Sequence, residues 1–158
     1  MKFISYILVF IWPVVAFSQN YTAKKLVDNL ILPQEIGKEW SAVNPENWPT
    51  GTNSHIVAMY ELKGADGKSE SVIADMFLFQ SSEQAGTMLK MRRKQIEAGE
   101  GMVIEDLPDV SRGAFASIHE SEKEIGRRVT FSCRNVVITI SPSKHSTRIS
   151  KIFSGKLK

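Results

Sequence analysis

The sequence predicts an α+β domain in which an antiparallel sheet of about five to six strands has helices packed on one face. Runs of alternating polar and apolar residues occur in pairs joined by short turns, as β-hairpins require. Segments with helical spacing of apolar residues separate these pairs. No repeat or long linker divides the sequence, so we expect one domain over residues 19–158 after a signal peptide over residues 1–18.

The first half of the chain supplies a short helix and a hairpin. Apolar residues at helical spacing follow Thr22 and predict a helix near residues 23–31. Alternation then predicts strands at 55–62 and 69–79. Residues 64–67 between them are typical of a turn, so we expect the two strands to pair as a hairpin.

A longer helix comes next. Ser81 and Gln84 form a capping-box pattern, which predicts a helix that begins beside Ser81 and ends near Gly99. Most residues of its inward face are apolar, although an arginine belongs to the same face. That face is formed by Ala85, Met88, Leu89, Arg92 and Ile96.

The second half predicts further strands and a closing helix. Short strands are expected at 102–105 and 113–119, followed by a hairpin of residues 127–133 and 136–140. After Pro142 we expect Ser146 to cap a last helix, because apolar residues recur at helical spacing up to Leu157.

The N-terminal pattern predicts export. Lys2 precedes an almost wholly apolar stretch over residues 3–15, and the small residues Ala16 and Ser18 suit cleavage before Gln19. The stretch is shorter than the ~20 residues that a membrane-spanning helix needs, so we expect cleavage rather than anchoring. No cysteine lies near the cut, which excludes a lipid-modified N-terminus. We therefore expect a periplasmic or secreted protein.

The charge argues against a nucleic-acid partner. The chain has 20 Lys and Arg and 17 Asp and Glu residues, and the expected signal holds one lysine and no acid, which leaves 19 minus 17, or +2. This excess is too small to indicate nucleic-acid binding. Residues 143–158 are locally basic and contain no acid. Such a helix either contacts an anionic membrane surface or acidic partner, or docks with a solvated charged face, which we favour.

Known catalytic patterns are absent from the sequence, including the Gly-x-Ser-x-Gly elbow, the phosphate loop and His-Glu-x-x-His. Cys133 is the only cysteine, so no intramolecular disulfide can form. Its strand pattern indicates a buried small apolar side chain, and a reactive thiol beside a histidine is the alternative.

His55 and His119 with Glu61 or Asp75 can hold zinc if their strands adjoin. We favour surface histidines, and expect neither metal nor cofactor.

Asp75 is the main candidate for a binding residue. It lies in a strand that is apolar on both sides, where an unpartnered acid is costly to bury. It therefore either faces a pocket or pairs with an arginine such as Arg128 on the open face of the sheet. We take Asp75, Tyr60 and Arg128 as the candidate binding residues.

Several segments together resemble a known group of proteins. These segments are Leu32-Pro33 with Gly37 and Trp40, residues 79–85, residues 107–115 and residues 129–138. They are similar to small exported bacterial domains of the Mog1/PsbP-like and lipoprotein sensor type. The resemblance implies a sheet-and-helix sandwich that binds or assists other molecules, usually without catalysis, and it brings no active-site residues with it.

We thus expect an exported, non-catalytic binding or accessory protein of the cell envelope, and not an enzyme. The expected partner is an envelope or extracellular protein, or an apolar small molecule, with contact to a membrane surface through the basic C-terminal helix as a further option. Two alternatives stay open. One is a small metal-dependent or thiol hydrolase using His55, His119, Asp75 or Cys133, and the other is an exported inhibitor or immunity protein.

Overall fold

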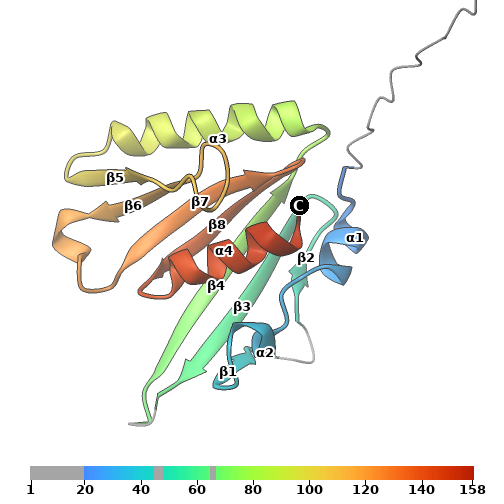
Figure 1. Cartoon of the computed structure of the whole chain (residues 1–158), viewed down its shortest axis with the longest axis vertical. Helices are drawn as coiled ribbons and strands as arrows, with labels where there is room; N and C mark the ends of the chain where they lie inside the picture. The colour runs from blue at the N-terminus through green and yellow to red at the C-terminus, as the bar shows by residue number, and fades with distance from the viewer. Residues whose placement is uncertain (1–19, 45–47, 65–66) are drawn as a thin grey trace, which may run out of the picture.

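A computed structural model describes residues 20–44, 48–64 and 67–158, and the predicted signal peptide lies outside these ranges. The described chain has a mixed α+β fold built on one antiparallel sheet (Figure 1). No helix within these ranges is long and apolar enough to cross a bilayer. In chain order the elements are α1 (Ala23–Asp28), α2 (Pro33–Ile36), β1 (Trp40–Ala42), β2 (Thr50–Gly51), β3 (His55–Lys63), β4 (Ser69–Leu78), α3 (Ser82–Glu97), β5 (Met102–Asp106), β6 (Phe115–His119), a 3-10 turn (Glu120–Glu122), β7 (Arg127–Cys133), β8 (Val136–Ser143) and α4 (Ser146–Lys156).

The sheet runs in the order β1-β3-β4-β8-β7-β6-β5, and β2 also pairs with β3. The antiparallel sheet is confirmed, but it has eight strands rather than five to six. The additional strands are β1 and β2, which are three and two residues long. Alternation cannot reveal strands this short, because it needs at least four residues to appear.

Two hairpins form the centre of the sheet, and both were predicted. In the first, β3 and β4 pair along nine residues, with Ala58 opposite Ala74. In the second, β7 pairs with β8 around a turn in which Arg134 has a φ of 52°. The two hairpins join where β4 pairs with β8, with Met76 opposite Ile138. This non-local pairing brings residues of the first hairpin beside those of the second.

One face of the sheet carries the main hydrophobic core. Alternate residues of β3, including Ile56 and Tyr60, point to this face and are buried. They pack with apolar side chains of α1, α2 and α4, among them Phe153, which is fully buried. Figure 1 shows α4 lying in front of the strands on this side. We call this side the core face.

The opposite face is partly covered by α3. Its inward residues Ala85 and Leu89 are buried, as are Phe115 and Val137, yet none of the four belongs to the main core cluster. Arg93 of α3 lies with its guanidinium 5.8 Å from the ring centroid of Phe115, which ties the helix to this face. Helices therefore lie on both faces, and the expectation of helices on one face is wrong. The reason is β8, whose first five residues are all buried and so need cover on each side.

The two longer helices begin differently. The Ser81 Oγ accepts a hydrogen bond from the Gln84 backbone N–H at 3.1 Å, so the predicted cap of α3 is confirmed. For α4 the cap position is His145, with no side-chain cap. Ser146 instead donates to the carbonyl of Ser143 at 2.9 Å, so the prediction that Ser146 caps this helix is wrong. The Ser146 hydroxyl serves to join α4 to the end of β8.

Candidate functional site

The half of the sheet that α3 leaves uncovered consists of the outward residues of β3 and β4. Strand alternation puts these side chains opposite the core face, and none of them is buried. We call this surface the open strip. It is formed by His55, Val57, Met59, Ile73, Asp75 and Phe77.

A cavity of about 330 Å³ lies where the open strip meets α3. Three strands and one helix supply its walls. β4 contributes Ile73 and Asp75, and α3 contributes Arg92. The remaining wall is formed by Arg128 of β7 with Thr139 and Ser141 of β8. Thr139 is the register partner of Asp75, so the pairing of β4 with β8 creates this site.

The two arginines of the cavity have no anionic partner in the described part of the chain. Among the described residues, neither Arg92 nor Arg128 forms an ion pair, and the guanidinium carbon of Arg92 lies 5.4 Å from the ring centroid of Phe77. By contrast the neighbouring Arg93 binds both Glu97 and Asp106. These contacts raise the pKa of the Arg93 guanidinium, which stays charged. The cavity therefore holds two guanidinium groups whose N–H donors have no acceptor within residues 20–44, 48–64 and 67–158.

Asp75 is engaged by a neighbour on the next strand. One carboxylate oxygen lies in hydrogen-bond contact with the His55 Nε2. The His55 ring in turn stacks on Phe77, with centroids 4.3 Å apart and planes 5° from parallel. The expected partner Arg128 lines the same cavity but forms no ion pair with Asp75. Asp75 is thus fixed in position by His55, and its carboxylate still faces the cavity.

Hydroxyl groups complete the lining. The Ser141 Oγ accepts a hydrogen bond of 2.9 Å from the backbone N–H of Ile73, just past the last paired residues of β4 and β8. The Ser141 proton is free to donate in another direction. Thr139 is 3.4 Å from Thr130 through their hydroxyl oxygens. The cavity thus combines cationic and hydroxyl donors, one carboxylate and the apolar side chain of Ile73.

Tyr60, the third predicted binding residue, lies elsewhere. It is on the core face, has no exposed surface, and its hydroxyl donates to the Ile31 carbonyl at 3.0 Å. Burial raises the pKa of this phenol well above its usual range. The structure therefore places Asp75 and Arg128 at the same cavity but leaves Tyr60 out. Successive residues of a strand point to opposite faces of the sheet, and Tyr60 points to the core face.

Cys133 is also on the core face and packs against the main core. Its Sγ lies 2.9 Å from the Leu157 carbonyl oxygen, to which it donates. Burial raises the pKa of the thiol, which disfavours a thiolate. The residue is half-buried rather than fully buried, but its direction agrees with the alternation of β7.

The histidines do not gather. His119 contacts the Ser121 hydroxyl, and His145 lies 3.8 Å from a carboxylate oxygen of Glu70. Within residues 20–44, 48–64 and 67–158, no three His, Cys, Asp or Glu side chains lie close enough to hold a metal ion. The suggested zinc set of His55 and His119 is therefore not assembled, because β3 and β6 are separated by three strands.

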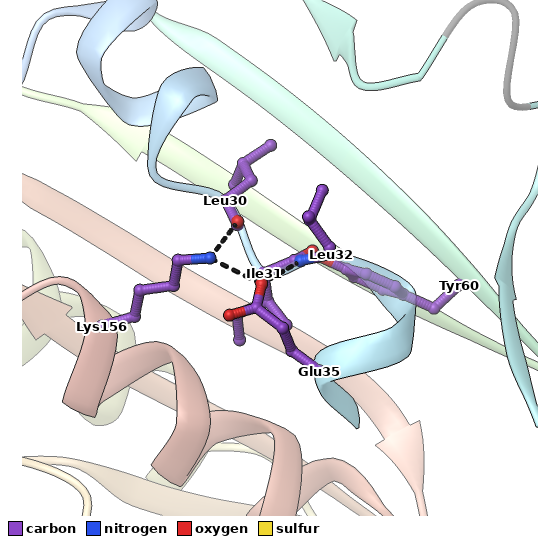
Figure 2. A network of polar contacts seen from close by, with 6 residues as sticks. All are labelled: Leu30, Ile31, Leu32, Glu35, Tyr60 and Lys156. Carbon is purple, nitrogen blue, oxygen red and sulfur yellow. Dashed lines mark hydrogen bonds and ion pairs between the residues drawn. The ribbon is translucent and has the colours of Figure 1, made fainter. Parts of the chain in front are cut away.

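The basic C-terminal helix is bound to the rest of the chain. Figure 2 shows Lys156 reaching the Leu30 carbonyl at 2.8 Å and the Glu35 carboxylate at 2.6 Å. Glu35 also accepts from the Leu32 backbone N–H at 2.6 Å. These hydrogen bonds hold the pKa of Glu35 below its usual value. We call this set, together with the bond from Arg148 to the Ile36 carbonyl at 2.6 Å, the α4 clamp.

Sequence reasoning missed Arg92, Thr139 and Ser141. Arg92 could have been recognised as a candidate, since it is the charged member of an otherwise apolar face of α3. Thr139 and Ser141 could not have been recognised, because nothing in the sequence shows that β8 pairs with β4. Comparison with known protein families, curated proteins and solved structures gave no match for this chain.

Proposed function

We propose that the chain is an exported, non-catalytic binding protein of the cell envelope, and that the cavity and open strip form its recognition surface. The observation that supports this most is the pair of arginines, Arg92 and Arg128, that line one cavity and form no ion pair with any described residue. An arginine on a surface normally pairs with a carboxylate or extends into solvent. Two that converge on a hollow beside a partly apolar surface favour binding of a ligand.

The proposed partner remains an envelope or extracellular protein, or a small molecule with an apolar portion. The test is affinity capture from an envelope extract, with native mass spectrometry for small ligands. The double variant Arg92→Gln with Arg128→Gln should no longer retain the partner or ligand that the wild-type protein captures. Arg112→Gln is the matched control, because Arg112 is exposed, forms no ion pair among the described residues and lines a different cavity. Identical retention by all three proteins would contradict the proposal.

Export is the other half of the proposal, and it depends on the N-terminal sequence pattern alone. N-terminal sequencing of the protein recovered from its native compartment should start at Gln19. A chain that retains Met1 would contradict export by cleavage.

A small hydrolase is the second candidate, and one observation favours it. The hydrogen bond between His55 and Asp75 orients an imidazole in the manner of a general base. The thiol version is not supported, because Cys133 lies on the opposite face from His55. Under our proposal, the pure wild-type protein and His55→Ala should both hydrolyse esters only at the background rate. Hydrolysis that disappears in His55→Ala would favour the enzyme instead.

An exported inhibitor or immunity protein is a special case of the binding proposal. The same capture experiment addresses it. Recovery of a single enzyme, with loss of that enzyme's activity in the complex, would favour this reading over small-molecule binding.

A further inference from the structure

We infer that the cavity binds a small organic anion, with its carboxylate or phosphate group between Arg92 and Arg128 and its apolar part along Ile73 and Met59. This inference rests on the proposed function and names its ligand class. It is carried by the charge of the cavity, by the order of residues across the strands and by the hydroxyl groups beside the arginines.

The charge of the cavity fits an anion. Arg92 and Arg128 contribute two positive charges and Asp75 one negative charge, so these three lining side chains together carry a net charge of +1. His55 touches Asp75 rather than the arginines, so the carboxylate is partly satisfied before any ligand arrives. Guanidinium groups present paired N–H donors that match the oxygens of carboxylates and phosphates. A cationic ligand would meet two like charges here.

The strand order gives the ligand a direction. Arg128 is on β7, Ser141 on β8, Ile73 on β4 and Met59 on β3, and these four strands are consecutive neighbours. Met59 is the register partner of Ile73. Three inter-strand steps span about 14 Å. A polar end therefore gives way to an apolar end along one line across the sheet.

The polar end is ready to donate further hydrogen bonds. Ser141 accepts from the Ile73 N–H, and its own proton has no acceptor among the described contacts. That proton is available to a ligand oxygen lying between the arginines. At the other end, Ile73 and Met59 are partly exposed apolar side chains that a ligand can cover. Covering them adds affinity in proportion to the apolar area removed from water.

The test measures binding of acetate, octanoate and inorganic phosphate to the whole mature protein by calorimetry, with backbone NMR to locate the site. Octanoate should bind roughly ten-fold more tightly than acetate, because its tail covers the apolar strip residues. Arg92→Gln and Arg128→Gln should each weaken both carboxylates about ten-fold. Arg112→Gln should leave both within about two-fold, as expected for an exposed charge at a distance.

A second variant tests the apolar end separately. Met59→Ser should weaken octanoate roughly five-fold and leave acetate unchanged, because only the tail reaches β3. Equal affinities for acetate and octanoate would overturn the apolar half of the inference. Equal effects of Arg92→Gln, Arg128→Gln and Arg112→Gln would overturn the anion site. Thermal unfolding of each variant verifies that loss of binding is not loss of fold.

A membrane surface is the competing source of the same chemistry. Vesicles of phosphatidylcholine with phosphatidylglycerol should not retain the protein under our inference. Retention on these vesicles, lost in the two arginine variants and without octanoate binding, would overturn it in favour of an anionic lipid surface. If no probe shifts the resonances of the cavity, the anion site is wrong. The broader binding proposal then still depends on the capture experiment with the arginine variants.

Discussion

Basic side chains play different parts on the two sides of the sheet. On the core face, Arg148 and Lys156 of the α4 clamp bind backbone carbonyls of residues 30–36, which joins the C-terminal helix to the N-terminal segment. On the other face, Arg92 and Arg128 line a cavity and lack an ion pair in the described chain. The comparison shows that a basic segment in the sequence does not by itself indicate a ligand site. The contacts of each charged side chain determine whether it stabilises the fold or is available to a ligand.

The largest expected effect belongs to the core under the clamp. Phe153→Ala should lower the free energy of unfolding by about 3–5 kcal/mol, because Phe153 is fully buried and packs edge-on against Tyr60, with centroids 6.4 Å apart. Urea denaturation monitored by circular dichroism measures the change. Met91→Ala on the exposed side of α3 is the control and should change stability little. A cost below about 1 kcal/mol for Phe153→Ala would contradict this description of the core.

The next effect separates Tyr60 from the binding surface. Tyr60→Phe should cost about 1–2 kcal/mol of stability, because the Ile31 carbonyl loses its buried donor. Binding at the cavity should not change, since the Tyr60 side chain belongs to the opposite face. Calorimetry with octanoate together with urea denaturation gives both quantities. A variant of normal stability that no longer binds octanoate would return Tyr60 to the site.

The clamp itself should contribute a smaller, pH-dependent amount. The folded-state pKa of Glu35 is lowered first by its hydrogen bond with Lys156 and then by that from Leu32. A lowered folded pKa adds stability above the unfolded value of ~4.3, and this contribution is lost as the pH falls through the folded pKa.

Lys156→Met tests this contribution while keeping most of the apolar stem. It should cost about 0.5–1 kcal/mol at neutral pH, because the pair is partly exposed. It should also flatten the decline of stability below about pH 4.5. Melting temperatures from pH 3 to pH 7 measure both. Lys151→Met, which removes the exposed contact with Asp109, is the control. Identical pH profiles for wild type and Lys156→Met would show that Lys156 does not set the Glu35 pKa.

The smallest expected effect is on the open side. Arg92→Gln and Arg128→Gln should each change the free energy of unfolding by less than about 0.5 kcal/mol, because neither guanidinium forms an ion pair in the described residues. Denaturation with urea measures this in the same series as Phe153→Ala. A loss above about 1 kcal/mol would mean that these arginines stabilise the fold, and the contrast between the two sides would fail.

Local sequence patterns predicted much of the fold. The β3–β4 hairpin follows from alternation and a turn, and the start of α3 follows from Ser81 and Gln84, so neither depends on distant residues. Of the site, Asp75 stood out as an acid in an apolar strand, and it does line the cavity with Arg128. Tyr60 was misplaced because the sequence does not say which side of a strand faces the helices. Arg92 could have been noticed as a charge on an apolar helical face.

The sequence by itself thus determined the hairpins, the long capped helix and the mixed α+β character, because these depend on residues close along the chain. It also determined the small formal net charge of the chain, +3. Tertiary structure alone decided that α3 and α4 lie on opposite faces, that β8 pairs with β4, and that Arg92 and Arg128 meet at one cavity. The physical reason is that long-range pairing combines residues over 30 positions apart. The periodicity of a segment depends only on residues close along the chain, so it does not reveal such contacts.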